Sequence, residues 1–309
     1  MTLTELRYIV AVARERHFGR AAAACFVSQP TLSVAIKKLE DELSVVLFER
    51  GKTEVRITPV GERIVAQTKR VLEEVEGIKR IAKQDQDQLD GPLRIGAIYT
   101  VAPYLLPQLI PVLHKEAPRM PLAIEENYTT RLQDRLLQGD LDAIIISLPF
   151  AEPGLTVRAL YDEPFMVVLP AGHPWRERAA IGVKELADEP VLMLGAGHCF
   201  RDQVLSVCPD CLRTPAADDP LAKAMEGGSL ETIRHMVASG LGITVLPCTA
   251  TGADKYAQRL LVLKRFKTPM PKRRVALAWR AAFYRPQAVA ALAKAIRSCK
   301  LSCVEFVGK

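Results

Sequence analysis

The pattern that most limits the possible folds lies in the last two thirds of the chain, where short apolar runs alternate with amphipathic stretches. Runs typical of strands occupy 93–98, 122–126, 141–146, 164–169, 191–194, 242–246 and 274–279, and helical periodicity occupies 104–115, 130–138, 229–239 and 287–298. This alternation predicts an α/β fold with parallel sheets covered on both faces. Two successive sets of strands and helices predict two lobes with a cleft between them.

Hydroxyl side chains stand at the ends of several of these expected elements. Thr100 follows the first strand and Thr129 follows the second. Because ligands of open α/β sheets bind at the carboxyl ends of the strands, we expect both threonines to face the cleft. Ser229 precedes a helix and is a candidate for its cap. Turn or cap chemistry is the alternative interpretation for all three hydroxyls.

Charge and cysteine content narrow the class of protein. The 309 residues carry a formal net charge of +7, which favours an anionic partner such as nucleic acid. We find no secretory signal and no uncharged apolar run of about 18 residues, so we expect a cytoplasmic protein without a membrane partner. Seven cysteines, an odd number in a reducing compartment, argue against a structural disulfide framework. Any disulfide is therefore expected to be regulatory.

Residues 1–61 have the plan of a DNA-binding helix-turn-helix. A first helix with apolar periodicity is followed by an alanine-rich helix at 20–25 and a longer helix at 29–43. The second helix of such a pair enters the major groove. The expected contacts are Gln29, Pro30 and Ser33 to base edges and Lys37 and Lys38 to phosphates. The alternative is an ordinary helical hairpin with a solvated polar face.

Two further features complete the N-terminal third. The alternating run 51–58 predicts a short hairpin, or wing, with Arg50 and Lys52 along the DNA backbone. Between 62 and 83 a seam of residues repeats alternately by four and three positions, which suits pairing with a second helix. The seam consists of Ile64, Thr68, Val71, Val75, Ile78 and Ala82. We expect 62–90 to be a linker and dimerisation helix with a hinge, followed by a regulatory domain at 91–309; the alternative is a helix lying on its own regulatory domain.

A pair of thiols brackets a short amphipathic helix in the regulatory domain. Cys199 follows two glycines, and Cys208 comes nine residues later, after a helical pattern at 200–207. A helix of that length places the two Cα atoms roughly 13 Å apart, whereas a disulfide tolerates at most about 7 Å. The two thiols can therefore bond only if the helix unwinds. The glycines, the helix N-terminus and Arg201 favour a reactive thiolate at Cys199, and a buried structural cysteine is the alternative.

The N-terminal residues resemble the winged helix-turn-helix of LysR-type transcriptional regulators. The resemblance rests on residues 18–22, 28–33 and 47–50. The stretch 197–203 with Cys208, together with 98–100, 125–129 and 229–232, is similar to the peroxide-sensing members of that family, over nearly the whole chain. It implies a regulatory domain of two α/β lobes of the periplasmic-binding-protein type.

The same resemblance implies roles for five residues. Cys199 is expected to be the peroxidatic thiol, oxidised by hydrogen peroxide to a sulfenic acid, and Cys208 the resolving thiol. Thr100, Thr129 and His198 are expected to line the peroxide pocket. The resemblance further implies homodimers that pair into a homotetramer, RNA polymerase as a partner, antioxidant genes as targets, and a protein that is not an enzyme and needs no cofactor.

Cys211 departs from the family pattern because it completes a C-x-x-C motif with Cys208. It can resolve in place of Cys208, bond to Cys208 or have no role, and we expect no role. A zinc site from His198, Cys199, Cys208 and Cys211 is not expected, because the helix separates these ligands. The other cysteines, at 25, 248, 299 and 303, read as core or incidental surface positions. Two other functions stay open: a LysR-type regulator that senses a small metabolite in the cleft, and a thiol peroxidase, against which the helix-turn-helix counts.

Overall fold

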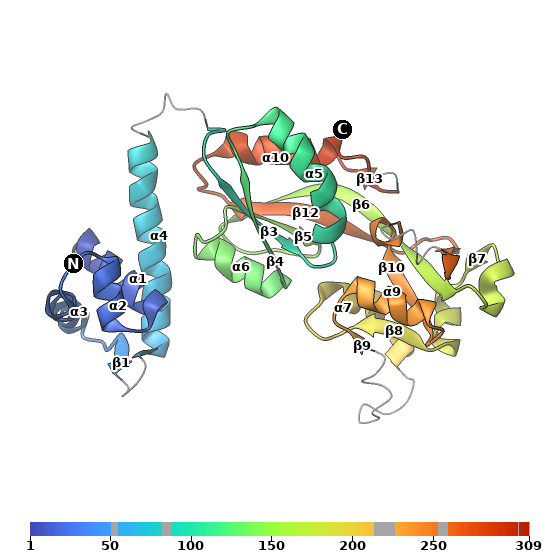
Figure 1. Cartoon of the computed structure of the whole chain (residues 1–309), viewed down its shortest axis with the longest axis horizontal. Helices are drawn as coiled ribbons and strands as arrows, with labels where there is room; N and C mark the ends of the chain where they lie inside the picture. Colours follow the sequence, from blue (N-terminus) through green and yellow to red (C-terminus); the bar gives the residue numbers. More distant parts are fainter. Residues whose placement is uncertain (51–54, 82–87, 213–225, 253–258, 302, 309) are drawn as a thin grey trace. The chain divides into compact units, whose positions relative to one another are not determined.

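The computed structural model describes residues 1–50, 55–81, 88–212, 226–252, 259–301 and 303–308. The chain divides into two compact units, one N-terminal and one C-terminal (Figure 1). Lys52 lies outside the described residues, and of Arg50 only the backbone is described. Among the described helices, none combines the length and the apolar character that crossing a membrane requires.

The N-terminal unit is a helix-turn-helix with a wing, as predicted. Its elements are α1 (Leu3–Glu15), α2 (Phe18–Ala24), α3 (Gln29–Leu43) and the antiparallel strands β1 (Phe48–Arg50) and β2 (Val55–Ile57). Ser28 caps α3 by accepting a hydrogen bond from the Thr31 N–H at 3.3 Å, and Pro30 lies in the first turn, where no N–H is needed. Leu32 and Leu39 are fully buried. The apolar stripe of α3 therefore faces the core and leaves its polar face outward.

The predicted linker helix is α4 (Pro59–Ile81). The first half of its seam packs within the N-terminal unit, where Thr68 is buried and Ile64 and Val71 contact the core. Ile78, in contrast, is 66% exposed. The first half of the seam is therefore covered by α1 of the same unit, and not by a second copy of the helix. Ala82 lies outside the described residues.

The first lobe of the C-terminal unit is built on a mixed sheet (Figure 1). Its strands are β3 (Leu93–Ile98), β4 (Leu122–Asn127), β5 (Ala143–Ser147) and β12 (Lys272–Arg280), with α5 (Ala102–Glu116) and α10 (Pro286–Ser298) on one side and α6 (Thr129–Leu137) on the other. β3 is parallel to β4 and β5, but β12 is antiparallel to β5. The predicted parallel order is wrong at β12 because the chain returns from the second lobe and enters this sheet from the opposite end.

The second lobe shares one long strand with the first. β6 (Leu155–Pro170) has 16 residues, whereas the sequence predicted only 164–169. Its first part pairs with β12, and its last part pairs with β10 (Ile243–Pro247) and β11 (Leu261–Phe266). The other described elements of the second lobe are β7 (Ala180–Ile181), β8 (Val191–Leu194), β9 (Glu226–Gly227), α7 (Cys199–Val207), α9 (Leu230–Ala238), and the 3-10 helices η1 (Pro174–Glu177), η2 (Val183–Asp188), η3 (Pro209–Leu212) and η4 (Cys248–Thr251). β13 (Glu305–Phe306) pairs with β6, and Phe306 packs against the core of the first lobe.

Two disulfides correct the cysteine predictions. Cys248, at the start of η4, bonds to Cys303, and Cys208 bonds to Cys211. Cys248 and Cys303 are therefore not incidental positions, because their bond joins the second lobe to the segment that leads into β13 of the first. The two residues are 55 positions apart in the chain, and β13, which follows Cys303, pairs with β6. Cys25, Cys199 and Cys299 are free thiols.

An ion-pair cluster between β6 and β12 makes part of the stability of the C-terminal unit depend on pH. Asp162 accepts hydrogen bonds from Arg274 and Lys272, each at 2.6 Å, and these bonds lower the pKa of its carboxyl to about 2. Because this pKa lies below the ordinary value of 3.8, the stabilisation is fully present above about pH 4 and is lost as the pH falls through 2.

We predict that Asp162→Asn lowers the free energy of unfolding by about 1 kcal/mol at pH 6, since both cationic partners are half-exposed and screened by water. The difference from the unmodified protein is expected to shrink to about half at pH 3. Urea unfolding at the two pH values measures it, with the exposed Asp188→Asn as control. An equal loss at both pH values contradicts this assignment.

Candidate functional site

The candidate site lies where α7 begins. Cys199 is the first residue of the helix, His198 precedes it, and Gly197 has a left-handed φ of +95°. A side chain at position 197 would lie against the ring of Tyr128, and the positive φ is strained for any residue with a side chain. The turn therefore needs glycine, and it holds the half-buried Cys199 at the helix N-terminus.

Cys199 lines a small cavity between the two lobes. The cavity has a volume of about 10 Å³, which is room for one water-sized group. The first lobe contributes the ends of β3 and β4 and the start of α6, and the second lobe contributes the turn before α7. The lining residues are Ile98, Tyr99, Thr100, Asn127, Tyr128, Thr129, Gly197, His198 and Cys199. The structure thus brings together the four residues that the sequence analysis placed around a peroxide.

The two threonine hydroxyls differ in their partners. Thr100 Oγ1 accepts a hydrogen bond from Arg273 Nη1 at 2.8 Å, and the Thr100 carbonyl accepts one from Nη2 at 2.8 Å. Because the Thr100 oxygen receives an N–H, its own proton is available to another acceptor. Thr129 Oγ1 is buried and has no hydrogen-bond partner within the described part of the chain. A buried hydroxyl without a partner costs about 1–3 kcal/mol, so the cavity suits a small ligand with hydrogen-bonding oxygens.

The third hydroxyl, that of Ser229, caps a helix and does not line the cavity. Ser229 Oγ accepts a hydrogen bond from the Thr232 N–H at 3.1 Å and so caps α9, and it is not among the residues that line the cavity. This is the helix cap for which the sequence analysis gave Ser229 as a candidate.

A buried ion pair, which the sequence analysis missed, holds Thr100 in place. Arg273 Nε donates to Glu163 Oε2 at 2.7 Å, and both side chains have 0% exposure. Glu163 also accepts hydrogen bonds from the backbone N–H and the hydroxyl of Thr249, in the second lobe. The Arg273 guanidinium lies 5.2 Å from the ring centroid of Phe200 in α7. One cation therefore contacts Thr100 on one side of the cavity and the cysteine-bearing helix on the other.

His198 and two tyrosines form the remaining wall. The imidazole is buried, and burial lowers its pKa, although a hydrogen bond with the Gly228 backbone opposes the shift. At neutral pH His198 is therefore uncharged, with one nitrogen that donates and one that accepts. The rings of Tyr99 and Tyr128 stack edge-on against it, with centroid distances of 5.9 and 4.8 Å. Both tyrosines are partly exposed, so this aromatic wall lies between the cavity and solvent.

Cys208 is bonded to Cys211 in this structure, which contradicts the expectation that Cys211 has no role. The expectation failed because the 3-10 turn of η3 directs Cys211 back towards the end of α7, where its N–H donates to the Cys208 carbonyl at 3.2 Å. Helix α7 is intact between Cys199 and Cys208, as predicted. Within the described residues, no group of three Cys, His, Asp or Glu side chains suits a metal ion.

Helix α7 also ties the two lobes together. Phe200 and Val204 are buried in the core of the second lobe, while Cys199 packs against the core of the first. Gln203 Nε2 donates to Ser147 Oγ at 2.8 Å and to the Leu148 carbonyl at 3.2 Å, both at the end of β5 in the first lobe. A change in the fold of α7 therefore changes contacts in both lobes.

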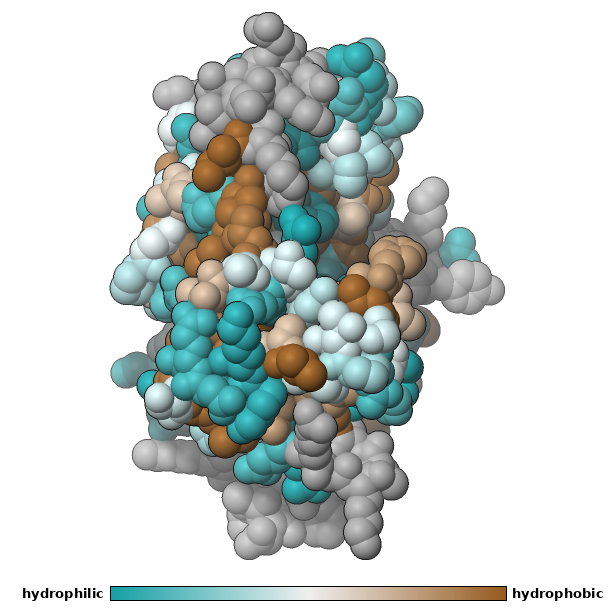
Figure 2. Space-filling model, turned by 90° about the vertical axis from the view of Figure 1, so that its left-hand side faces the viewer, coloured by the Kyte–Doolittle hydropathy of each residue, from teal (hydrophilic) through white to brown (hydrophobic). Residues whose placement is uncertain are grey.

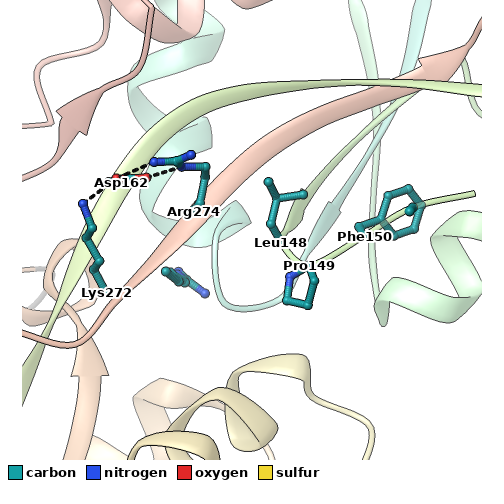
Figure 3. Close-up of a pocket in the computed structure, with 8 residues that line it drawn as sticks. Leu148, Pro149, Phe150, Asp162, Lys272 and Arg274 are labelled. Carbon is teal, nitrogen blue, oxygen red and sulfur yellow. Dashed lines mark hydrogen bonds and ion pairs between the residues drawn. The ribbon is translucent and has the colours of Figure 1, made fainter.

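A larger cavity of about 670 Å³ lies nearby and bears on the metabolite alternative (Figure 3). Leu148, Pro149 and Phe150 form its apolar side. Its exposed cations, Lys272 and Arg274, both point to Asp162, whose carboxylate they share. Because Asp162 already neutralises part of their charge, Lys272 and Arg274 are weak binding groups for an anionic metabolite.

The predicted DNA-contacting residues lie on the outward side of α3. Gln29, Pro30, Lys37 and Lys38 are exposed and Ser33 is half-buried. Lys37 forms an exposed ion pair with Asp41, at 3.1 Å, which phosphate can displace. In the view from the side of the N-terminal helices, hydrophilic and intermediate side chains cover most of the described surface, and hydrophobic ones form separate patches (Figure 2). The described side chains of α3 thus leave a polar face free for a duplex.

Known families and proteins match most of the chain. The family "Bacterial regulatory helix-turn-helix protein, lysR family" matches residues 3–62, and "LysR substrate binding domain" matches residues 86–299. The chain is 42% identical over 280 residues to the hydrogen peroxide-inducible genes activator of Pectobacterium carotovorum subsp. carotovorum, covering 91% of this chain and 90% of the relative. It is 41% identical to the DNA-binding transcriptional dual regulator OxyR of Escherichia coli K12, covering 96% and 95%. A full-length OxyR variant from Pseudomonas aeruginosa has 54% identity and a TM-score of 0.85, covering 100% and 99%.

We predict that Arg273→Ala lowers the free energy of unfolding by about 3–5 kcal/mol, because it leaves Glu163 charged and buried without its cation. Adding Glu163→Gln to that variant removes the stranded charge and is expected to restore part of the loss. Urea unfolding of the two variants measures the difference. If Arg273→Ala alone loses less than about 1 kcal/mol, the prediction is wrong, because water or another cation then compensates the charge of Glu163.

Proposed function

Because this chain belongs to the LysR family of bacterial transcriptional regulators, we propose that it binds DNA and senses hydrogen peroxide through Cys199. The observation that carries the proposal is the free thiol of Cys199 on a cavity of about 10 Å³ that also presents Thr100, Thr129 and His198. A cavity of that size admits a water-sized oxygen and excludes larger metabolites. The metabolite alternative is therefore not favoured.

The cavity can assist the oxidation of Cys199 by peroxide. The thiolate attacks one peroxide oxygen, the O–O bond breaks, and the products are a cysteine sulfenic acid and hydroxide. The Thr100 hydroxyl, whose oxygen already accepts from Arg273, has a proton to donate to the departing oxygen. The Thr129 hydroxyl gains the partner that it lacks, and the neutral His198 can donate or accept. Each of these groups thus acts through a hydrogen bond to the peroxide.

The switch follows when Cys208 is a thiol. Its thiolate attacks the sulfenic sulfur, hydroxide leaves, and a Cys199–Cys208 disulfide forms. Since α7 holds the two Cα atoms roughly 13 Å apart and a disulfide spans at most about 7 Å, the helix has to unwind. Unwinding removes the Gln203 bonds to Ser147 and Leu148 and the burial of Phe200, and so alters the contact between the lobes.

The N-terminal unit reads the DNA in this proposal. Residues 1–61 form the DNA-binding domain, 62–90 the linker and dimerisation segment, and 91–309 the regulatory domain. Gln29, Pro30 and Ser33 contact base edges, and Lys37, Lys38, Arg50 and Lys52 contact phosphates. The exposed Ile78 on α4 supports pairing with a second copy, and pairs of dimers give a homotetramer. Its partners are then double-stranded DNA and RNA polymerase, and its place of action is the cytoplasm.

The test is a comparison of Cys199→Ser with the unmodified protein after full reduction. We expect the unmodified protein to lose two thiols per chain and to change its DNA footprint with one equivalent of peroxide, and Cys199→Ser to do neither while it still binds DNA. Cys299→Ser is the control, because burial raises the pKa of that thiol to about 11 and makes it unreactive at neutral pH. A Cys199→Ser protein whose footprint still responds to peroxide refutes the proposal.

A further inference from the structure

Cys208 has two possible partners, and the structure shows which one is compatible with a folded α7. Cys208 and Cys211 are bonded with a Cα–Cα distance of 5.5 Å, while Cys199 is free and α7 is intact from Cys199 to Val207. Cys211 lies in η3, directly after the helix, and its backbone N–H donates to the Cys208 carbonyl. Bonding Cys208 to Cys211 therefore needs no rearrangement of the helix.

The two disulfides of Cys208 differ in what they cost the fold. A Cys199–Cys208 bond requires unwinding of α7 and exposes Phe200 and Val204, which are 2% and 3% exposed in the folded helix. It also removes the two hydrogen bonds of Gln203 to the first lobe. The Cys208–Cys211 bond keeps all of these contacts. Refolding of α7 thus favours the second disulfide over the first.

Resting on the peroxide-sensing function proposed above, we propose that Cys211 is a second resolving thiol that ends the signal. Once Cys199 and Cys208 are bonded, the Cys211 thiolate attacks the sulfur of Cys208. The Cys208–Cys211 bond forms, the Cys199–Cys208 bond breaks, and Cys199 leaves as a thiolate. Over the whole sequence one hydrogen peroxide becomes two waters, Cys208 and Cys211 are oxidised to a disulfide, and Cys199 returns to its starting oxidation state.

The product of this relay has the properties of a refractory state. Its α7 is folded, so the contacts between the lobes are those of the form without a Cys199–Cys208 bond. Its Cys199 can react with peroxide again, but Cys208 is no longer available to resolve the sulfenic acid. Cys208 and Cys211 are 3% and 4% exposed, so their bond is shielded from reductants in solution. The chain therefore returns from the switched fold without a reductase and does not switch again until Cys208–Cys211 is reduced.

The test follows the disulfides over time in the full-length protein. Fully reduced chains receive one equivalent of hydrogen peroxide, are quenched with an alkylating agent at intervals, and are digested without reductant for mass spectrometry. In the unmodified protein we expect the Cys199–Cys208 peptide to rise first and then decline as Cys208–Cys211 replaces it and Cys199 becomes alkylated. In Cys211→Ser and Cys211→Ala we expect Cys199–Cys208 to persist at least about ten times longer. Cys299→Ser is expected to behave as the unmodified protein does.

Three outcomes overturn the relay. The first is an equal lifetime of Cys199–Cys208 in the unmodified protein and both Cys211 variants, which leaves the peroxide-sensing function standing. The second is peroxide-dependent formation of Cys208–Cys211 at an undiminished rate in Cys199→Ser, which shows that the C-x-x-C pair is oxidised on its own. The third is unchanged alkylation of Cys199 at every time in the unmodified protein and in both Cys211 variants, which removes the proposed function and the relay with it.

Discussion

The regulatory domain depends on one constraint: the backbone hydrogen bonds of α7 keep Cys199 and Cys208 at opposite ends of a helix, which acts as a rigid rod. The helix is short, and isolated helices of this length are unstable in water. Its stability comes from the burial of Phe200 and Val204 and from the bonds that Gln203 makes across the cleft. Disulfide formation at Cys199 thus has to break contacts of α7 in both lobes, and this requirement couples the thiol chemistry to the arrangement of the lobes.

The buried pair of Arg273 and Glu163 connects that rod to the peroxide cavity. Arg273 lies on β12, Glu163 lies on β6, and these two strands run between the lobes. The guanidinium orients the Thr100 hydroxyl and lies against Phe200, so the hydroxyl that faces the cavity and the helix that responds to oxidation share one support. Buried ion pairs contribute little net stability. Here the pair instead fixes the geometry of the cavity that we propose for the peroxide.

Much of this arrangement could be predicted from the sequence because the chemistry stands at element ends. Thr100 and Thr129 follow strands, Cys199 begins a helix, and sheet topology brings such ends together. Arg273 and Glu163 escaped notice because charged residues in a strand normally face water, and their pairing joins positions 110 residues apart. The Cys248–Cys303 bond was missed for a similar reason, since it depends on the pairing of β13 with β6. The spacing of residues along the chain predicted helices, strands and their ends. It gave no indication of contacts between residues far apart in the chain, which form because the chain passes twice between the lobes.

Amide hydrogen exchange of residues 200–207 tests the central claim most directly. The measurement compares the fully reduced protein with protein in which the Cys199–Cys208 disulfide has formed. The account predicts that these amides, protected by helical hydrogen bonds in the reduced protein, exchange at the rate of an open chain once the disulfide is present. Amides that remain equally protected in both forms contradict it, because they show that the two sulfur atoms can join across an intact helix.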